Sequence, residues 1–266
     1  MSPSQGFASV VILVALVAAP SAVRAAAPLT VSVEGAVQAP GAQQHEVGSR
    51  FSDALEAAAP RRDAYALGAS VFRATAHAAQ VRQRAGLLHD LKLVAESNEV
   101  PTAVASRAAA LHAWVESLPA TGRVPLEGNV RRLEVSLGDS NSLLANGDRL
   151  FLPERPDTVT VTGAVQAPCS LPHVPDRDAV AYASACLVDT RAADPDALIV
   201  IQPDGHIAEL GVAMWNRSPA QALAPGAIVL VPFRLRHIAR LTPELNSELA
   251  SFLATQPLPH DPLGLP

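Results

Sequence analysis

The stretch Val31-Ser-Val-Glu-Gly-Ala-Val-Gln-Ala-Pro40 returns later in the chain as Val159-Thr-Val-Thr-Gly-Ala-Val-Gln-Ala-Pro168. Eight of the ten positions are identical, and one of the other two exchanges Ser for Thr. A second pair of similar stretches follows, Leu144–Pro153 after the first copy and Leu223–Pro232 after the second. A repeat of this kind indicates that the chain folds the same small module twice.

The spacing of these stretches shows that the two modules differ in length. The opening stretches lie 128 residues apart and the closing stretches 79 apart, so the first module holds about 49 additional residues. The insertion, at about 60–120, contains two runs of helical periodicity, over Val71–Ser97 and Thr102–Leu118. Because only Asn98–Pro101 separates the two runs, they predict an antiparallel helical hairpin.

Apolar periodicity and turn signals predict the same order of elements in both modules. That order is a strand hairpin, a crossing helix and further strands, which predicts an α+β fold of two tandem β-grasp modules. Ser49 and Asp176 are the expected helix N-caps. In the first module we expect a strand at 30–37, a helix from Ser49 to about 59, and strands at 123–126 and 130–136. In the second we expect strands at 158–163, 169–174, 197–202, 206–212 and 227–231, with a helix at 177–187.

The chain begins with a segment that is typical of an export signal. Residues 7–19 are almost wholly apolar, too few to span a bilayer comfortably, and small residues follow them. We expect residues 1–25 to be a signal peptide; because no Lys or Arg precedes the apolar run, an uncleaved anchor is the alternative. No membrane span is expected in the mature chain. The predicted domains are 28–155 for the first module, 156–235 for the second, and 240–256 for a C-terminal amphipathic helix.

The composition limits the partners and the covalent chemistry of the chain. The formal net charge is −5, so binding to nucleic acid by electrostatic attraction is not expected. Of the 20 basic residues 19 are Arg, so a single Arg carries little information about function. The two cysteines, Cys169 and Cys186, can form one disulfide in an exported protein or remain two buried thiols, and the sequence leaves both alternatives open.

The sequence contains no motif that is typical of catalysis or metal binding. The eight histidines are scattered without metal-ligand spacing. His89 and His112 both fall in the helical hairpin, where a surface pair is favoured over a metal site. Gly138-Asp139-Ser140 resembles the nucleophile block of some esterases, but ordinary loop residues before a turn are the favoured interpretation. We predict no catalytic residue, no metal site and no cofactor.

Two tryptophans are the candidate binding residues. Trp215 and Asn216 follow a predicted strand, where the indole could stack on a sugar ring while the amide bonds its hydroxyl groups. The favoured alternative is that Trp215 covers the open end of the core beside an Asn in a turn. Trp114 is out of phase with the apolar stripe of its helix, so it either packs the hairpin against a module or contacts a partner.

Residues 243–254 predict a short amphipathic helix near the C-terminus. Its apolar face can dock on the chain's own modules, or it can bind a partner or a membrane surface. Because the helix carries Glu244 and Glu248 and no Lys or Arg, docking or partner binding is favoured over an anionic membrane. The candidate contact residues on this face are Leu245, Leu249, Phe252 and Leu253.

These features together resemble the GfcC family of capsule-biosynthesis proteins, over nearly the whole mature chain. Each motif alone is weak, but their order and spacing are fairly specific. The motifs are the openings at Gly35 and Gly163, Tyr65-Ala-Leu-Gly-Ala69, Gln202-Pro-Asp-Gly205, Trp215-Asn216, Pro225-Gly226, Val231-Pro232 and Leu245-Asn246.

The resemblance implies two β-grasp domains of the soluble ligand-binding (SLBB-like) type, similar to domains of the Wza-type polysaccharide export channel. It implies a helical hairpin inserted in the first domain and an amphipathic helix at the end of the chain. It also implies a periplasmic, non-enzymatic protein whose partners are capsule export components or the polysaccharide itself, in an oligomeric state it does not specify. The alternatives are a periplasmic enzyme that modifies the glycan and a module that binds a small ligand.

Overall fold

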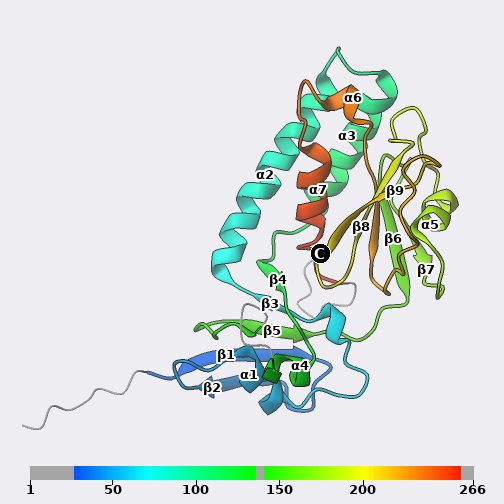
Figure 1. The fold of residues 1–266 in the computed structure, drawn as a ribbon. Helices are drawn as coiled ribbons and strands as arrows, with labels where there is room; N and C mark the ends of the chain where they lie inside the picture. The colour runs from blue at the N-terminus through cyan, green and yellow to red at the C-terminus, as the bar shows by residue number, and fades with distance from the viewer. Residues whose placement is uncertain (1–26, 136–140, 259–266) are drawn as a thin grey trace, which may run out of the picture.

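The computed structural model describes residues 27–135 and 141–258, and shows an α+β protein with two sheets (Figure 1). The expected signal peptide and the Gly138-Asp139-Ser140 sequence lie outside the described residues. Among the described helices, none is long and apolar enough to cross a membrane.

Both sheets are mixed, have five strands and follow the same strand order. The first is ordered β2-β1-β5-β3-β4 and the second β7-β6-β10-β8-β9. In each, the first and last strands of the module pair in parallel at the centre, while the other neighbours are antiparallel. The strands of the first module are β1 (Leu29–Gly35), β2 (Gly41–His45), β3 (Ser70–Phe72), β4 (Arg123–Pro125) and β5 (Arg149–Leu152). Those of the second are β6 (Thr158–Gly163), β7 (Cys169–Pro172), β8 (Ala197–Ile201), β9 (Ile207–Gly211) and β10 (Ile228–Val231).

The repeated sequence stretches are the two central strands of each sheet, which explains their similarity. The glycine that ends the first strand, Gly35 or Gly163, has a φ of +93° or +96°, a conformation that favours glycine. A Cβ on either glycine would collide with the backbone oxygen at the end of the parallel neighbour, Leu152 or Val231. The glycine at this position therefore permits a close approach of the two paired strands that a residue with a Cβ would prevent.

Short helices cover one side of each sheet, and here the structure corrects two expectations. Residues 130–136 were expected to be a strand, but Val130–Val135 form helix α4, which packs on α1 (Phe51–Ala58). Val130 and Leu133 are three residues apart, which places them on one face of a helix but on opposite faces of a strand, and both pack on the first core, Leu133 fully buried. The helix caps also shift, because Arg50 caps α1 and Asp178 caps α5 (Ala179–Ala185).

The insertion forms a hairpin of α2 (Ala74–Glu96) and α3 (Thr102–Ser117), preceded by the short strand β3 that the sequence analysis included in the helix. The hairpin rises from the first sheet and lies along the second, with α7 (Leu245–Leu253) beside it (Figure 1). Its apolar residues belong to the same core as the second sheet and α7. The first sheet has a separate core made only of first-module residues. Short helices η1 (Ala66–Gly68) and α6 (Leu235–Ile238) complete the fold.

Candidate functional site

The hairpin, α7 and the second sheet share one apolar contact, and we call it the seam. The four candidate contact residues of α7 are all buried there, at most 2% exposed. Helix α7 packs against α2 and β8. Of the two alternatives favoured from the sequence, docking on the chain itself and partner binding, the structure shows the first for these side chains. The four residues are Leu245, Leu249, Phe252 and Leu253.

The start of α7 is fixed to the end of the second sheet by one side chain. Asn246 accepts a hydrogen bond from the Phe233 backbone N–H at 2.9 Å and donates one to the Phe233 carbonyl at 2.8 Å. The amide side chain thus pairs with both the backbone N–H and the backbone carbonyl of one buried residue, as a neighbouring strand would. Asn246 thus sets the direction in which α7 leaves α6.

The buried side chain of Arg123, on β4, joins three parts of the molecule at the seam. Its guanidinium donates to the Pro203 carbonyl at 2.8 Å and to the Ala254 carbonyl at 3.1 Å. Pro203 lies in the turn between β8 and β9, and Ala254 is the C-cap residue of α7. Arg123 therefore connects the first module to the second module and to the C-terminal helix. The sequence analysis missed it, because its acceptors are backbone carbonyls far away in the chain.

A second arginine fixes the hairpin to the other end of the second module. Arg107 on α3 donates to the Gln166 carbonyl at 2.9 Å and lies 3.7 Å from a carboxylate oxygen of Asp189. The Asp189 side chain is only 9% exposed, so solvent screens this pair less than a surface pair. Arg107 thus joins the hairpin, and Arg123 the first sheet, to opposite ends of the second module.

Trp114 lines a small cavity at the seam. The cavity has a volume of about 130 Å³ and is bordered by the hairpin, the second sheet and α7. Trp114 packs against the apolar core of the second module and is partly buried. Of the two predicted roles, packing of the hairpin against a module is the one the structure supports. Other residues around the cavity are Leu118, Arg123, Thr160, Ile201 and Leu253.

Trp215 lies in the loop after β9 and is 77% exposed, next to Met214 at 94%. The expectation that Trp215 covers the core is therefore wrong. Asn216 holds the loop from within, because its side chain accepts from the Ala213 N–H at 3.0 Å and donates to the Asp196 carbonyl at 2.9 Å. The indole is thus presented to solvent on a braced loop, while the amide has a structural role.

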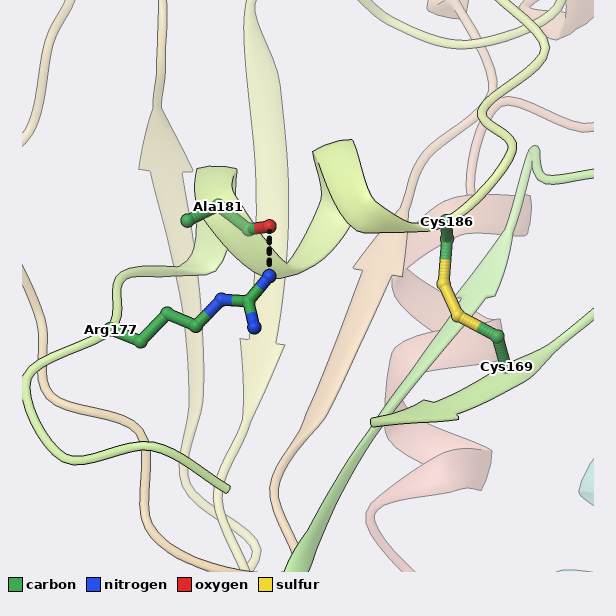
Figure 2. The surroundings of a disulfide bond; sticks show 4 residues. All are labelled: Cys169, Arg177, Ala181 and Cys186. Atoms are coloured by element: carbon green, nitrogen blue, oxygen red, sulfur yellow. Dashed lines mark hydrogen bonds between the residues drawn. A yellow bond between two sulfur atoms is a disulfide. The ribbon is translucent and has the colours of Figure 1, made fainter. Parts of the chain in front are cut away.

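Cys169 and Cys186 form a disulfide, the first of the two alternatives that the sequence left open (Figure 2). The bond joins the start of β7 to the C-cap of α5, with the two Cα atoms 6.4 Å apart. Arg177, just before this helix, donates to the carbonyl of Ala181 within it at 2.9 Å (Figure 2). The disulfide therefore fixes the helix to the edge of the second sheet.

The two modules also contact each other through Tyr65. Its hydroxyl donates to the Pro225 carbonyl at 2.9 Å, and burial raises the pKa of the phenol to about 12. A hydroxyl that stays protonated keeps this bond over the physiological pH range. Across residues 27–135 and 141–258 there is no group of three or more His, Cys, Asp or Glu side chains that could hold a metal ion.

Comparison with known proteins finds a family match for part of the second module and the C-terminal helix. Residues 167–257 match the family model described as capsule biosynthesis GfcC C-terminal. The chain is also similar to the uncharacterized protein YjbG of Escherichia coli (strain K12), with 28% identity over 194 residues, 72% of this chain and 76% of YjbG. The family match runs from β7 to just past α7, the part of the chain on which the hairpin docks.

Proposed function

We propose that this protein is a non-enzymatic accessory of capsular polysaccharide assembly or export, because residues 167–257 match the C-terminal model of the GfcC capsule-biosynthesis family and the chain is similar to YjbG. The family match over residues 167–257 is the observation that carries the proposal. In this role the chain binds other export components or the polysaccharide, and catalyses no step itself.

The strand order supports a more specific fold assignment. We infer that both modules are β-grasp domains of the SLBB-like type, because each has a parallel central pair flanked by an N-terminal hairpin and by antiparallel strands. The resemblance to the GfcC family implies domains similar to those of the Wza-type polysaccharide export channel. A binding role is consistent with such domains.

The seam makes the two modules suitable for acting as one body. Arg123, Arg107 and Tyr65 each connect elements of the first module to the second. A partner that binds either module would therefore act on both, since moving one requires these bonds to break. We place the candidate contacts on the exposed loops, among them Trp215, because α7 is already occupied within the chain.

We propose the periplasm as the location of the protein. Two features support this, the export signal expected at residues 1–25 and the disulfide between Cys169 and Cys186. Disulfides form and persist in the bacterial periplasm and are rare in the reducing cytosol. A fractionation experiment on cells, with trapping of free thiols, tests the location and the oxidation state together.

Deletion of the gene tests the proposed function directly. Surface capsule and cell-retained polymer are scored separately in the deletion strain and in a strain complemented with the wild-type gene. Loss of surface polymer with retention inside the cell is expected, because an accessory of assembly or export acts after synthesis. Unchanged amounts in both pools would remove the proposal and favour a small-ligand or enzymatic role.

A further inference from the structure

Four basic residues gather at α6, and none of them forms an ion pair among the described residues. Residues 210–243 contain no Asp or Glu, although the whole chain has a net charge of −5. Arg234, Arg236, His237 and Arg240 lie within this stretch. We call these four residues the α6 basic cluster.

The geometry places two of the guanidinium groups on one side of the helical turn. Arg236 and Arg240 are four residues apart, and both are exposed. The backbone stays helical past α6, because the Ala239 N–H donates to the Leu235 carbonyl at 2.8 Å and the next turn closes at Leu241. Helix α6 lies at the end of the molecule that also holds the turn between α2 and α3 (Figure 1).

The cluster is electrostatically unfavourable by itself. Burial, and then the charges of Arg236 and Arg234, lower the pKa of His237. Because Arg236 Nε donates to His237 Nε2 at 3.3 Å, the proton of the neutral ring lies on Nδ1. That Nδ1 and the Nε of Arg234 are buried and have no hydrogen-bond partner within the described chain, so they are out of reach of a ligand on the surface. The exposed side chains of Arg236 and Arg240 form none of the ion pairs among the described residues, and a negatively charged oxygen ligand stabilises such cations.

The backbone that carries the cluster is held firmly in place. Ile238, in the middle of the cluster, is fully buried, and Phe233 just before it is fixed by the Asn246 side chain on both its N–H and its carbonyl. Little ordering of the backbone is therefore needed when a ligand binds. The planar guanidinium fork matches carboxylate and phosphate oxygens in pairs.

We propose that the α6 basic cluster binds the acidic groups of a polysaccharide, carboxylates or phosphates carried along a sugar chain. This inference rests on the proposed function, which brings such a polymer to the protein. A membrane surface is disfavoured, because Leu235 is the one exposed large apolar residue of this four-residue helix and supplies little area to bury in a bilayer. Nucleic acid is disfavoured by the acidic net charge.

The binding test uses the purified full-length mature protein and two glycan probes of matched length. Hyaluronate oligosaccharides carry a regular carboxylate, and dextran oligosaccharides are neutral. We expect the protein to bind hyaluronate, more weakly at high salt, and not dextran. The variant R236Q/R240Q should weaken hyaluronate binding by about tenfold or more, the effect of losing charge-assisted hydrogen bonds.

The matched control is R62Q/R131Q, which removes two exposed arginines of the first module and so changes the net charge equally. It should change the affinity by less than about twofold, because screening weakens interactions over such distances. All of these side chains are exposed, so the variants should retain the wild-type melting temperature. An equal loss of affinity in both variants would overturn the proposal, since it would show attraction by net charge alone.

Two further outcomes separate this inference from the proposed function. If hyaluronate does not bind, or if only vesicles containing phosphatidylglycerol bind through Arg236 and Arg240, the glycan site is wrong even where gene deletion reduces surface capsule. If R236Q/R240Q loses hyaluronate binding while deletion leaves both polymer pools unchanged, the anion site stands and the proposed function is wrong.

Discussion

The two modules share a strand order, yet their sheets are stabilised in different ways. The first sheet has a core built only from first-module residues, including Phe51 and Leu55 on α1. The core of the second sheet includes residues from outside its module, such as Leu91 on α2 and Phe252 on α7. The second sheet thus uses a layer that the first module encodes.

This difference shows that two modules with the same strand order can form their apolar cores in different ways. An insertion in one copy serves as a wall of the other, so the boundary of the sequence repeat does not coincide with the boundary of the apolar core. The bonds from Arg107 and Arg123 are the polar counterpart of that arrangement. We call the core of the first sheet the self-contained core and the core of the second sheet the borrowed core, and substitutions in each can be compared.

The largest effect is expected from Phe252→Ala, which removes a fully buried ring from the seam. Such a truncation typically destabilises the fold by about 3–5 kcal/mol, because transfer and cavity terms add. Urea unfolding measures the loss of free energy. Hydrogen exchange followed by mass spectrometry should show faster exchange of the backbone amides in α2, α3 and the second sheet together. Exchange confined to α7 would mean that the hairpin does not depend on the helix.

Phe51→Ala is the matched control in the self-contained core, since Phe51 is also buried. It should accelerate exchange in the first sheet and α1 while the seam stays protected. If each variant loosened both cores equally, the modules would unfold as one unit and the comparison would fail.

Removal of the disulfide should have the next largest effect. The cysteines are 17 residues apart, and C169A/C186A is expected to lower the free energy of unfolding by about 3 kcal/mol, the usual effect of a loop of this length. Thermal melts of the variant, the oxidised wild type and the reduced wild type check this. The loss should be confined to the second module; an unchanged melting temperature in reductant would contradict the expectation.

The repeat was the part of the structure that the sequence predicted best. It located β1, β6 and β10, whereas β5 was not predicted as a strand and the pairing of the central strands was not predicted at all. Strand β3 was missed, since three residues leading straight into α2 carry no pattern of their own. The apolar face of α7 was predicted, but the sequence could not indicate which surface it contacts.

The polar part of the site was less accessible to prediction. Arg123 bonds to carbonyls 80 and 131 residues away, and no local pattern marks such a contact. The α6 basic cluster was hidden by a composition in which 19 of the 20 basic residues are Arg. The signal that was available is the absence of any acidic residue from 210 to 243. Counting uncompensated charges is therefore more informative than counting arginines.

A smaller effect is expected from Arg123→Lys, which keeps the charge but loses the planar fork. One ammonium group cannot replace the separate bonds to Pro203 and Ala254, so we expect a loss of about 1–3 kcal/mol in the free energy of unfolding. Fluorescence of Trp114, beside Arg123 at the cavity, should report the change. Arg131→Lys, at an exposed site, is the control; equal effects would show that Arg123 is not a connector.

The smallest effect concerns the charge at the contact between α7 and α2. Burial, and then the nearby Asp90, raise the pKa of Glu248. A carboxyl whose pKa rises on folding destabilises the folded state as the pH increases through that pKa, because the ionised form is disfavoured there. Glu248→Gln should therefore stabilise the seam at pH 7 by less than about 0.5 kcal/mol, the usual size of exposed charge interactions, with no gain at a pH below the carboxyl pKa. Melting curves at both pH values, with Glu56→Gln on α1 as the control, measure this difference. A gain that persisted at low pH would come from packing and not from titration, and the seam would then be insensitive to pH in this range.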